Sequence, residues 1–401
     1  MRLHKPKLIK RVDLPLSKSE CNRWLILQDL FPGTINIQSL STAEDVVILN
    51  RLLQEKPDVY DCGMAGTTLR FLIARLSLLS GEHLVTGHPR LKERPIKGLV
   101  DALRHLGADI TYTEKEGHTP VRIVGRSLEG GEVHIDNTHS SQFVSALMLI
   151  GSALPHGLSI HCKSMGVSAP YIYMTAQVMQ TMGVALSIDG STIRIKPFKK
   201  TLASKDIKVE PDWSAASYGY AMVLLGQDSE VYFPRLKQPS FQGDALVANY
   251  FAPLGVETIY TGAGVRIKKS TRCMSERSYT LNLSGNPDLA QTLVVACVGV
   301  GQTFRFGGLH TLKIKETDRL LALKNELAVV GATLTIGDDF IEWQGDETIH
   351  PPTRAFDTYN DHRMAMSLAT LATLFPIDIN NPEVVEKSFP RFFEAFFGDV
   401  C

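Results

Sequence analysis

Polar and apolar residues follow a pattern along this chain that recurs six times. At each recurrence a polar or glycine-containing cluster leads directly into an apolar, small-residue stretch that predicts a buried helix. The clusters begin at Lys18, Gly66, Ser140, Trp213, Pro287 and Asp361. The last five are 73 or 74 residues apart, which indicates a repeated structural unit. A helix start carries unpaired N–H groups and partial positive charge, so six such starts suggest a protein that gathers helix N-termini around an anionic small molecule.

A second periodic feature is a glycine that ends a helix-like segment and precedes a strand-like run. These glycines are Gly107, Gly183, Gly255 and Gly331. Glycine is expected there because it adopts the left-handed conformation without strain.

The pattern between these markers predicts one order of elements. Strands are expected at 121–124, 133–136 and 193–196, buried inner helices at 143–150 and 293–298, and an amphipathic outer helix at 95–106. One unit therefore reads strand, inner helix, strand, outer helix and two strands. Six units predict an α/β protein of two globular domains; the alternative for any repeat is a solenoid, although a period near 74 residues exceeds that of common solenoids.

Composition mainly excludes partners. The 42 Lys and Arg residues balance 42 Asp and Glu residues, so neither nucleic acid nor a membrane surface is expected as a partner. The N-terminal stretch lacks the apolar core of a signal peptide, and no apolar run reaches the length of a transmembrane helix. The six cysteines form no CxxC pair and the histidines no HxxxH pair, so we expect reduced thiols, a cytoplasmic location and neither metal nor other cofactor.

Residues 315–319, Lys-Glu-Thr-Asp-Arg, form the first cluster with chemical potential. They can be interpreted as a helix start, with Thr317 as the cap and Asp318 in the first turn. That interpretation leaves Lys315 and Glu316 unexplained, and we therefore predict a functional site.

Residues 361–366, Asp-His-Arg-Met-Ala-Met, form the second. Asp361 can cap a helix, but His362 and Arg363 would then lie at the positive end of the helix dipole, which opposes cations. A bound anion would offset that cost, so this cluster too is predicted to be functional.

Other clusters are less specific. Residues 90–94 place three cations before a proline, which suits phosphate or carboxylate but is equally typical of a solvated loop. Residues 63–70 resemble a phosphate cradle without the ATP-binding form GxxxxGK[ST], and residues 140–142 offer hydroxyl and amide donors. Asp288 is as readily a cap as a base. Together these groups favour a phosphorylated and carboxylated substrate pair.

The chain resembles the 5-enolpyruvylshikimate-3-phosphate synthase family of enolpyruvyl transferases. LPLSKS at 14–19 is similar to that family's LPGSKS, MAGTTLR at 64–70 to its NAGTAxR, and LKERPI at 91–96 to its LKERPI. The remaining segments are SSQF at 140–143, SAPY at 168–171, KETDR at 315–319, DHRMAM at 361–366 and KSFP at 387–390. KETDR and DHRMAM are the most specific, and the resemblance covers nearly the whole chain.

The resemblance implies the enolpyruvyl transferase fold, an α/β architecture of two domains, each of three βαβαββ inverse-barrel units. One domain would join residues 1–16 to 212–401, and the other would comprise residues 17–211. The active site would lie in the cleft between them, which closes around the substrates. A monomer is expected.

The resemblance also implies a reaction of the shikimate pathway, on the route to chorismate and the aromatic amino acids. The 5-hydroxyl of shikimate 3-phosphate would attack C2 of phosphoenolpyruvate, and the tetrahedral intermediate would lose phosphate. Asp288 would accept the hydroxyl proton with Lys315 close by. Glu316, oriented by His362, would protonate the methylene carbon.

The substrate contacts implied by the resemblance fall into two sets. Shikimate 3-phosphate would be held by Ser19, Arg23, Ser140, Ser141, Gln142, Ser168 and Tyr171. Phosphoenolpyruvate would be held by Lys18, Gly66, Thr67, Arg94, Arg319, Arg363 and Lys387, with Lys18 also among the catalytic groups.

Departures from the family pattern keep alternatives open. Leu16 replaces the glycine of LPGSKS, Met64 the asparagine of NAGT, and Ala169 a common lysine. A non-catalytic paralogue that binds a phosphorylated ligand is one alternative. The sister enzyme that acts on UDP-N-acetylglucosamine is the other, but it commonly uses a cysteine acid, and this chain has no cysteine between Cys62 and Cys162.

Overall fold

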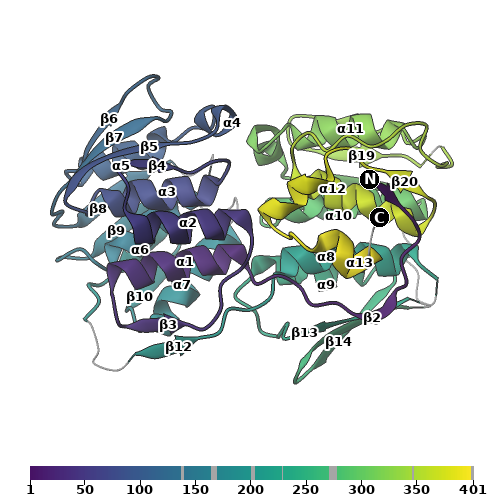
Figure 1. The fold of residues 1–401 in the computed structure, drawn as a ribbon, viewed down its shortest axis with the longest axis horizontal. Coiled ribbons are helices and arrows are strands. Elements are labelled where there is room, and N and C mark those ends of the chain that lie inside the picture. The colour runs from purple at the N-terminus through teal and green to yellow at the C-terminus, as the bar shows by residue number, and fades with distance from the viewer. Residues whose placement is uncertain are drawn as a thin grey trace. The chain divides into compact units, whose positions relative to one another are not determined.

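The computed structural model describes residues 1–136, 140–163, 169–199, 204–227, 229–270, 278–345 and 347–398. The chain divides into two compact units. Unit 1 comprises Met1–Leu16 and Glu210–Cys401, and unit 2 comprises Ser17–Val209. Both are α/β (Figure 1).

Unit 2 alternates strands and helices. Its helices are α1 (Lys18–Leu30), α2 (Glu44–Glu55), α3 (Gly66–Leu76), α4 (Pro89–Lys92), α5 (Lys97–His105), α6 (Ser141–Gly151) and α7 (Ala169–Met182). Its strands are β3 (Ile35–Ile37), β4 (Val59–Asp61), β5 (Gly81–Thr86), β6 (Asp109–Tyr112), β7 (Val121–Gly125), β8 (Gly131–Ile135), β9 (Leu158–Cys162), β10 (Leu186–Asp189), β11 (Thr192–Ile195) and β12 (Lys205–Ile207).

The sheets of unit 2 surround three inner helices. The sheets β4-β5-β7-β6 and β8-β9-β11-β10 share one topology, a parallel first pair followed by two antiparallel pairs. A parallel pair, β3-β12, forms the third sheet. Register places Val85 between Tyr60 and Val121, all three buried, so this line of residues faces the core. Helices α1, α3 and α6 contact one another.

Unit 1 repeats the arrangement. Its strands are β1 (Arg2–Leu3), β2 (Ile9–Arg11), β13 (Glu230–Pro234), β14 (Val256–Thr261), β15 (Gly264–Lys269), β16 (Tyr279–Asn282), β17 (Phe304–Gly307), β18 (Thr335–Ile336), β19 (Ile341–Trp343) and β20 (Ile377–Asp378). Its α-helices are α8 (Trp213–Leu225), α9 (Val247–Phe251), α10 (Ala290–Val300), α11 (Arg319–Ala328), α12 (His362–Ala369) and α13 (Phe392–Phe397). Its 3₁₀ helices are η1 (Gly243–Leu246), η2 (Pro287–Leu289), η3 (His310–Ile314), η4 (Thr370–Thr373) and η5 (Pro382–Lys387).

The sheets β2-β13-β15-β14 and β16-β17-β19-β18 have the same topology as those of unit 2, and β1 pairs with β20. Strand β2, purple in Figure 1, completes a sheet whose other strands come from the second half of the chain. Helix α10 contacts α8 and α12 in a continuous hydrophobic core. None of the helices in the described ranges is long and apolar enough to cross a membrane.

The predicted helix starts are largely confirmed. Side-chain caps at Ser17, Ser140, Asp212 and Asp361 open α1, α6, α8 and α12, because their oxygens accept N–H groups of the first turn. The cluster at Pro287 differs, since it opens a 3₁₀ turn before α10 begins. The outer helix predicted from Pro95 also begins later, at Lys97, because the chain becomes helical only after Ile96.

The glycine prediction is confirmed. Gly107, Gly183, Gly255 and Gly331 have φ angles of 97°, 111°, 103° and 91°. These left-handed values turn the chain from an outer helix into the following strand. The predicted strands also appear, as β7, β8 and β11.

Candidate active site

Arg319 is the centre of a charged cluster in unit 1. Its Nε lies 2.7 Å from Asp361 Oδ2, its Nη1 3.0 Å from Asp288 Oδ1 and its Nη2 2.9 Å from Glu316 Oε2. Its side chain is only 2% exposed, so these ion pairs are shielded from water. One rigid guanidinium thus fixes three carboxylates relative to one another.

The position of Arg319 follows from local helix chemistry. Arg319 is the first residue of α11, and Asp318 is the cap, whose Oδ1 accepts the N–H groups of Leu320 and Leu321, both at 3.1 Å. The prediction of Thr317 as cap is therefore wrong by one residue. A carboxylate also suits this position because it faces the positive end of the helix dipole.

Asp288 lies between several cations. Besides Arg319, Arg363 approaches it, with Nη2 3.1 Å from Oδ2 and Nη1 donating to the Asp288 carbonyl at 3.1 Å. Lys315 Nζ is 3.9 Å from Oδ1. Burial acts to raise the pKa of Asp288, but Arg363, Lys315 and Arg319 together outweigh it and hold that pKa well below its usual range.

Glu316 has a separate set of contacts. Its Oε1 lies 2.6 Å from Lys387 Nζ, at the end of η5, while Oε2 contacts Arg319. We call Asp288, Lys315, Glu316, Arg319, Asp361, Arg363 and Lys387 the Arg319 cluster. Two of its three carboxylates, Asp288 and Glu316, each contact more than one cation and could exchange protons with a substrate, while the cations could bind its anionic groups.

His362 is buried at the start of α12, with Nδ1 4.0 Å from Asp361 Oδ1. It thus adjoins the Arg319 cluster. The orientation of Glu316 by His362 stays a prediction.

In unit 2, Lys18 and Arg23 come from α1. Lys18 Nζ pairs with Asp45 Oδ2 at 3.0 Å. Arg23 is buried, and it donates to the backbone carbonyls of Ser19 at 2.6 Å and Tyr171 at 3.1 Å. Burial lowers the pKa of Arg23 to about 10. The guanidinium of Arg23 thus connects the backbones of Ser19 and Tyr171, which are also predicted to bind shikimate 3-phosphate.

The starts of α3 and α6 contact each other through side chains. Gln142 Nε2 donates to Thr67 Oγ1 at 3.0 Å. Ser140 caps α6 by accepting from the Gln142 N–H at 3.2 Å, and Ser141, the first helical residue, is buried. The Gln142–Thr67 hydrogen bond therefore links a residue predicted to bind shikimate 3-phosphate to one predicted to bind phosphoenolpyruvate. Ser168 lies outside the described residues.

Arg94 lies directly against Gly66 at the start of α3. A Cβ on Gly66 would lie 2.6 Å from Arg94 Nη1 and 2.9 Å from Arg70 Nη1. Arg70 also donates to the Gly66 carbonyl at 3.1 Å and to the Pro95 carbonyl at 3.2 Å. A larger residue at this position would displace these guanidinium groups from their present places.

Sequence reasoning missed three residues at these sites. Arg70 is one turn after Gly66, and its helical i+4 spacing was the available signal. Asp361 was interpreted only as a cap, yet it also pairs with Arg319. Asp45, the partner of Lys18, carried no signal because the pair is 27 residues apart.

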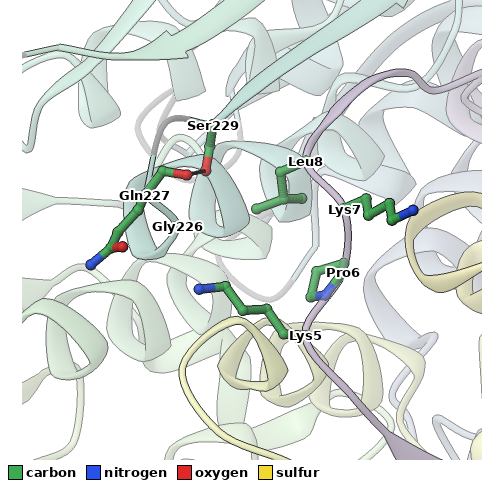
Figure 2. A pocket seen from close by; sticks show the side chains of 7 residues that line it. All are labelled: Lys5, Pro6, Lys7, Leu8, Gly226, Gln227 and Ser229. Carbon is green, nitrogen blue, oxygen red and sulfur yellow. Dashed lines mark hydrogen bonds between the residues drawn. The ribbon is translucent and has the colours of Figure 1, made fainter.

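A separate pocket of about 340 Å³ lies elsewhere in unit 1 (Figure 2). Its lining comprises Lys5, Pro6, Lys7, Leu8, Gly226, Gln227 and Ser229. In Figure 2 the Lys7 side chain extends away from Gln227 and Ser229. The two lysines therefore do not converge on one anion, and the pocket shares no residue with the Arg319 cluster.

Comparisons with known proteins agree with the sequence resemblance. The family model described as EPSP synthase (3-phosphoshikimate 1-carboxyvinyltransferase) matches residues 34–396. A 3-phosphoshikimate 1-carboxyvinyltransferase of Bacteroides fragilis is 41% identical over 98% of this chain and 96% of its own. One of Shewanella halifaxensis is 34% identical over 97% and 96%.

Solved structures show the same fold. An EPSP synthase of Acinetobacter baumannii superimposes with a TM-score of 0.76 at 22% identity, covering 98% of this chain and 96% of its own. At this identity the likeness concerns the fold alone. From the family match and the near full-length relatives, the chain belongs to the EPSP synthase (3-phosphoshikimate 1-carboxyvinyltransferase) family.

Proposed function

We propose that this chain transfers the enolpyruvyl group of phosphoenolpyruvate to the 5-hydroxyl of shikimate 3-phosphate and releases phosphate, in the shikimate pathway. The observation that carries this proposal is the Arg319 cluster. It combines carboxylates that can move protons with cations that can bind an anionic substrate. Membership of the family supplies the identity of the two substrates.

In the proposed reaction, Asp288 takes the proton of the 5-hydroxyl as its oxygen bonds to C2 of phosphoenolpyruvate. Glu316 gives a proton to the methylene carbon, which becomes a methyl group. The C2–phosphate bond of this intermediate then breaks, Glu316 takes a proton back from the methyl group, and the departing phosphate takes the proton from Asp288. Lys315, 3.9 Å from Asp288, stabilises the charge on the base.

The pairing of Asp288 with arginines has a consequence for its basicity. A carboxylate whose pKa is strongly depressed is a weak base. Phosphoenolpyruvate carries a carboxylate and a phosphate, and we propose that these anions take over contacts that Arg319 and Arg363 make with Asp288. The pKa of Asp288 would then rise, so arrival of the substrate would activate the base.

The remaining substrate contacts come from unit 2. Lys18, Arg94 and the backbone of Gly66 and Thr67 would assist Arg319, Arg363 and Lys387 in binding phosphoenolpyruvate. Shikimate 3-phosphate would be held by Ser19, Arg23, Ser140, Ser141, Gln142, Tyr171 and Ser168. The Thr67–Gln142 hydrogen bond supports placing the two substrates next to each other.

We also propose that units 1 and 2 are the two domains of the family's fold, each with three βαβαββ inverse-barrel repeats. The two four-stranded sheets and one two-stranded sheet of each unit support this.

Because both units supply residues proposed to bind substrate, ligand binding is expected to bring the units together. Small-angle scattering that shows no compaction with both ligands would contradict this. A cytoplasmic monomer completes the proposal, and the buried, reduced thiols of Cys62 and Cys297 agree with a reducing location.

Leu16, which stands where the family has a glycine, is compatible with this function. Leu16 forms an antiparallel bridge with Pro211, an extended conformation that a leucine adopts without strain. Presentation of Lys18 by the following turn therefore does not require glycine at this position.

The test is phosphate release by the purified protein from phosphoenolpyruvate, with shikimate 3-phosphate or UDP-N-acetylglucosamine as acceptor. The proposal expects release with shikimate 3-phosphate only. Release with UDP-N-acetylglucosamine would assign the chain to the sister reaction. Release with neither acceptor would contradict the proposal and favour the ligand-binding paralogue.

A further inference from the structure

Asn286, two residues before Asp288, is held at both ends of its side chain. Its Nδ2 donates to Asp244 Oδ1 at 3.0 Å, and its Oδ1 accepts from the Tyr250 hydroxyl at 3.2 Å. Its backbone N–H and carbonyl are also bonded, to Leu283 and Leu289, both at 3.0 Å. These four hydrogen bonds restrain Asn286, so the turn that leads to Asp288 starts from a restrained residue.

Asn286 does not use its side chain in the way its position suggests. It is the residue that caps η2, yet its side chain accepts none of the free N–H groups of that turn. Asparagine is among the preferred capping residues. Here the oxygen that would cap the turn accepts from the Tyr250 hydroxyl, while the amide nitrogen donates to Asp244, so the buried side chains of Asn286 and Asp244 are bound to each other.

Asp244 joins three segments of unit 1. It belongs to η1, accepts a hydrogen bond from the Ser214 hydroxyl in the first turn of α8, and accepts another from Asn286 before η2. Among the residues that the structure describes, both hydrogen-bond partners of Asp244 are neutral, and the side chain is buried, so none of them supplies the directly bonded cation that usually accompanies a buried charge. The pKa of Asp244 is raised, mainly by burial, although Arg363 acts to lower it and Asp288 adds to the rise. The effects of Arg363 and Asp288 show that Asp244 is within electrostatic reach of the Arg319 cluster.

We propose that Asp244 is a positioning residue for the transfer reaction: by holding Asn286, it sets the orientation in which Asp288 presents its carboxylate. This rests on the proposed role of Asp288 as the base. The orientation is demanding, because Oδ1 of Asp288 contacts Arg319 at 3.0 Å while Oδ2 contacts Arg363 at 3.1 Å. A shift of about 1 Å in a reacting group can lower a rate by about a hundredfold.

The first variant is Asp244→Asn. It keeps the side-chain volume but removes the charge and replaces an acceptor oxygen by a donating amide nitrogen. The contact with Asn286 Nδ2 is lost where that nitrogen faces it, and otherwise both contacts are weakened because neither is to a carboxylate any longer. We expect kcat to fall by about tenfold or more, with a much smaller change in KM for shikimate 3-phosphate. Asn286→Ala breaks the same contact from the other side and should reproduce the effect, so the test does not depend on one variant folding.

A matched control separates positioning from stability. Tyr220→Phe removes a partly buried hydrogen bond of unit 1, the 3.0 Å contact with Thr258, which lies outside the Arg319 cluster. Its melting temperature should fall by an amount comparable to that of Asp244→Asn, while its kcat should stay within about twofold of the wild type. The double variant Asp244→Asn with Asn286→Asp again places an amide donor opposite a carboxylate acceptor between positions 244 and 286. It should therefore recover part of the kcat lost in Asp244→Asn.

The deciding measurement is made with Asp288→Asn. If Asp244 acts through Asp288, adding Asp244→Asn to Asp288→Asn will lower the residual kcat no further, because the group that was positioned is already lost. An equal loss in both backgrounds, or an unchanged kcat in Asp244→Asn alone, would overturn the proposal. Wild-type protein that fails to release phosphate would instead contradict the proposed function, so the two failures are distinguishable.

Discussion

Replacing Arg319 by methionine leaves three carboxylates, those of Asp288, Glu316 and Asp361, without the cation that they share. Methionine occupies much of the same volume but carries no charge, and the Asp361 side chain is 0% exposed, so water cannot replace the lost contact. Removing one partner of a buried ion pair costs about 3–5 kcal/mol. We therefore expect the free energy of unfolding of unit 1 to fall by about 4 kcal/mol at neutral pH, a large part of the 5–15 kcal/mol typical of proteins.

The size of this loss depends on pH. In the wild type the pKa of Asp288 is depressed, so its contribution to stability is complete above its unfolded pKa of about 4 and is lost only as pH falls through the lower folded value. Without Arg319, one of the cations that lower the pKa of Asp288 is lost while burial still acts to raise it, so this pKa rises. The folded variant then binds protons more readily and recovers stability as pH falls. The difference between wild type and variant should be larger at pH 8 than at pH 5.

Urea unfolding followed by tryptophan fluorescence measures this difference. Of the three tryptophans, Trp213 and Trp343 lie in unit 1, so a Trp24→Phe background makes the signal specific to that unit. Arg391→Met is the control, because its side chain is 76% exposed and its solvated ion pair with Glu394 should contribute little to stability. An Arg319→Met variant as stable as this control at pH 8 would refute the reasoning.

Three further predictions follow from other contacts. Lys387→Met removes the 2.6 Å contact with Glu316 and a proposed phosphoenolpyruvate cation, so KM for phosphoenolpyruvate should rise about tenfold or more in the phosphate-release assay; an unchanged KM would contradict this role. Gly66→Ala places a methyl group 2.6 Å from Arg94 Nη1, and the displaced guanidinium should raise the same KM by about tenfold while the urea midpoint of unit 2 changes little; an unaltered KM would show that Arg94 does not act there. Burial raises the pKa values of the Cys62 and Cys297 thiols, so iodoacetamide at pH 7.5 should alkylate them at least about tenfold more slowly in the folded than in the urea-unfolded protein. Mass spectrometry measures both rates, and equal rates would count against the burial of these thiols.

Local chemistry explains why much of the fold could be predicted from the sequence. The caps at Ser140, Asp212 and Asp361 bond to groups two or three residues away, and the left-handed glycines reflect a backbone preference of one residue. The error at Thr317 lies within the same physics, because Thr and Asp both cap helices and the sequence does not decide which of two neighbours does so.

Contacts between distant segments had no such signal. The resemblance identified Asp288 and Arg319 separately, but the 3.0 Å contact joins residues 31 positions apart in two different elements. Asp45 and Asp244 are ordinary acids in sequence, and only the folded chain brings them to Lys18 and to Asn286. Neither periodicity nor capping rules encode these partners.

The central claim is that two carboxylates of the Arg319 cluster transfer the protons of the reaction, and deuterium incorporation tests it most directly. In D₂O the proposed donation by Glu316 places deuterium on the methylene carbon, so the enolpyruvyl product of the wild type should carry it when examined by NMR. Glu316→Gln should lower product formation and deuterium incorporation together by about a hundredfold or more, whereas Glu394→Gln, a change at an exposed ion pair, should alter neither. Glu316→Gln with wild-type rate and deuterium content would contradict the account.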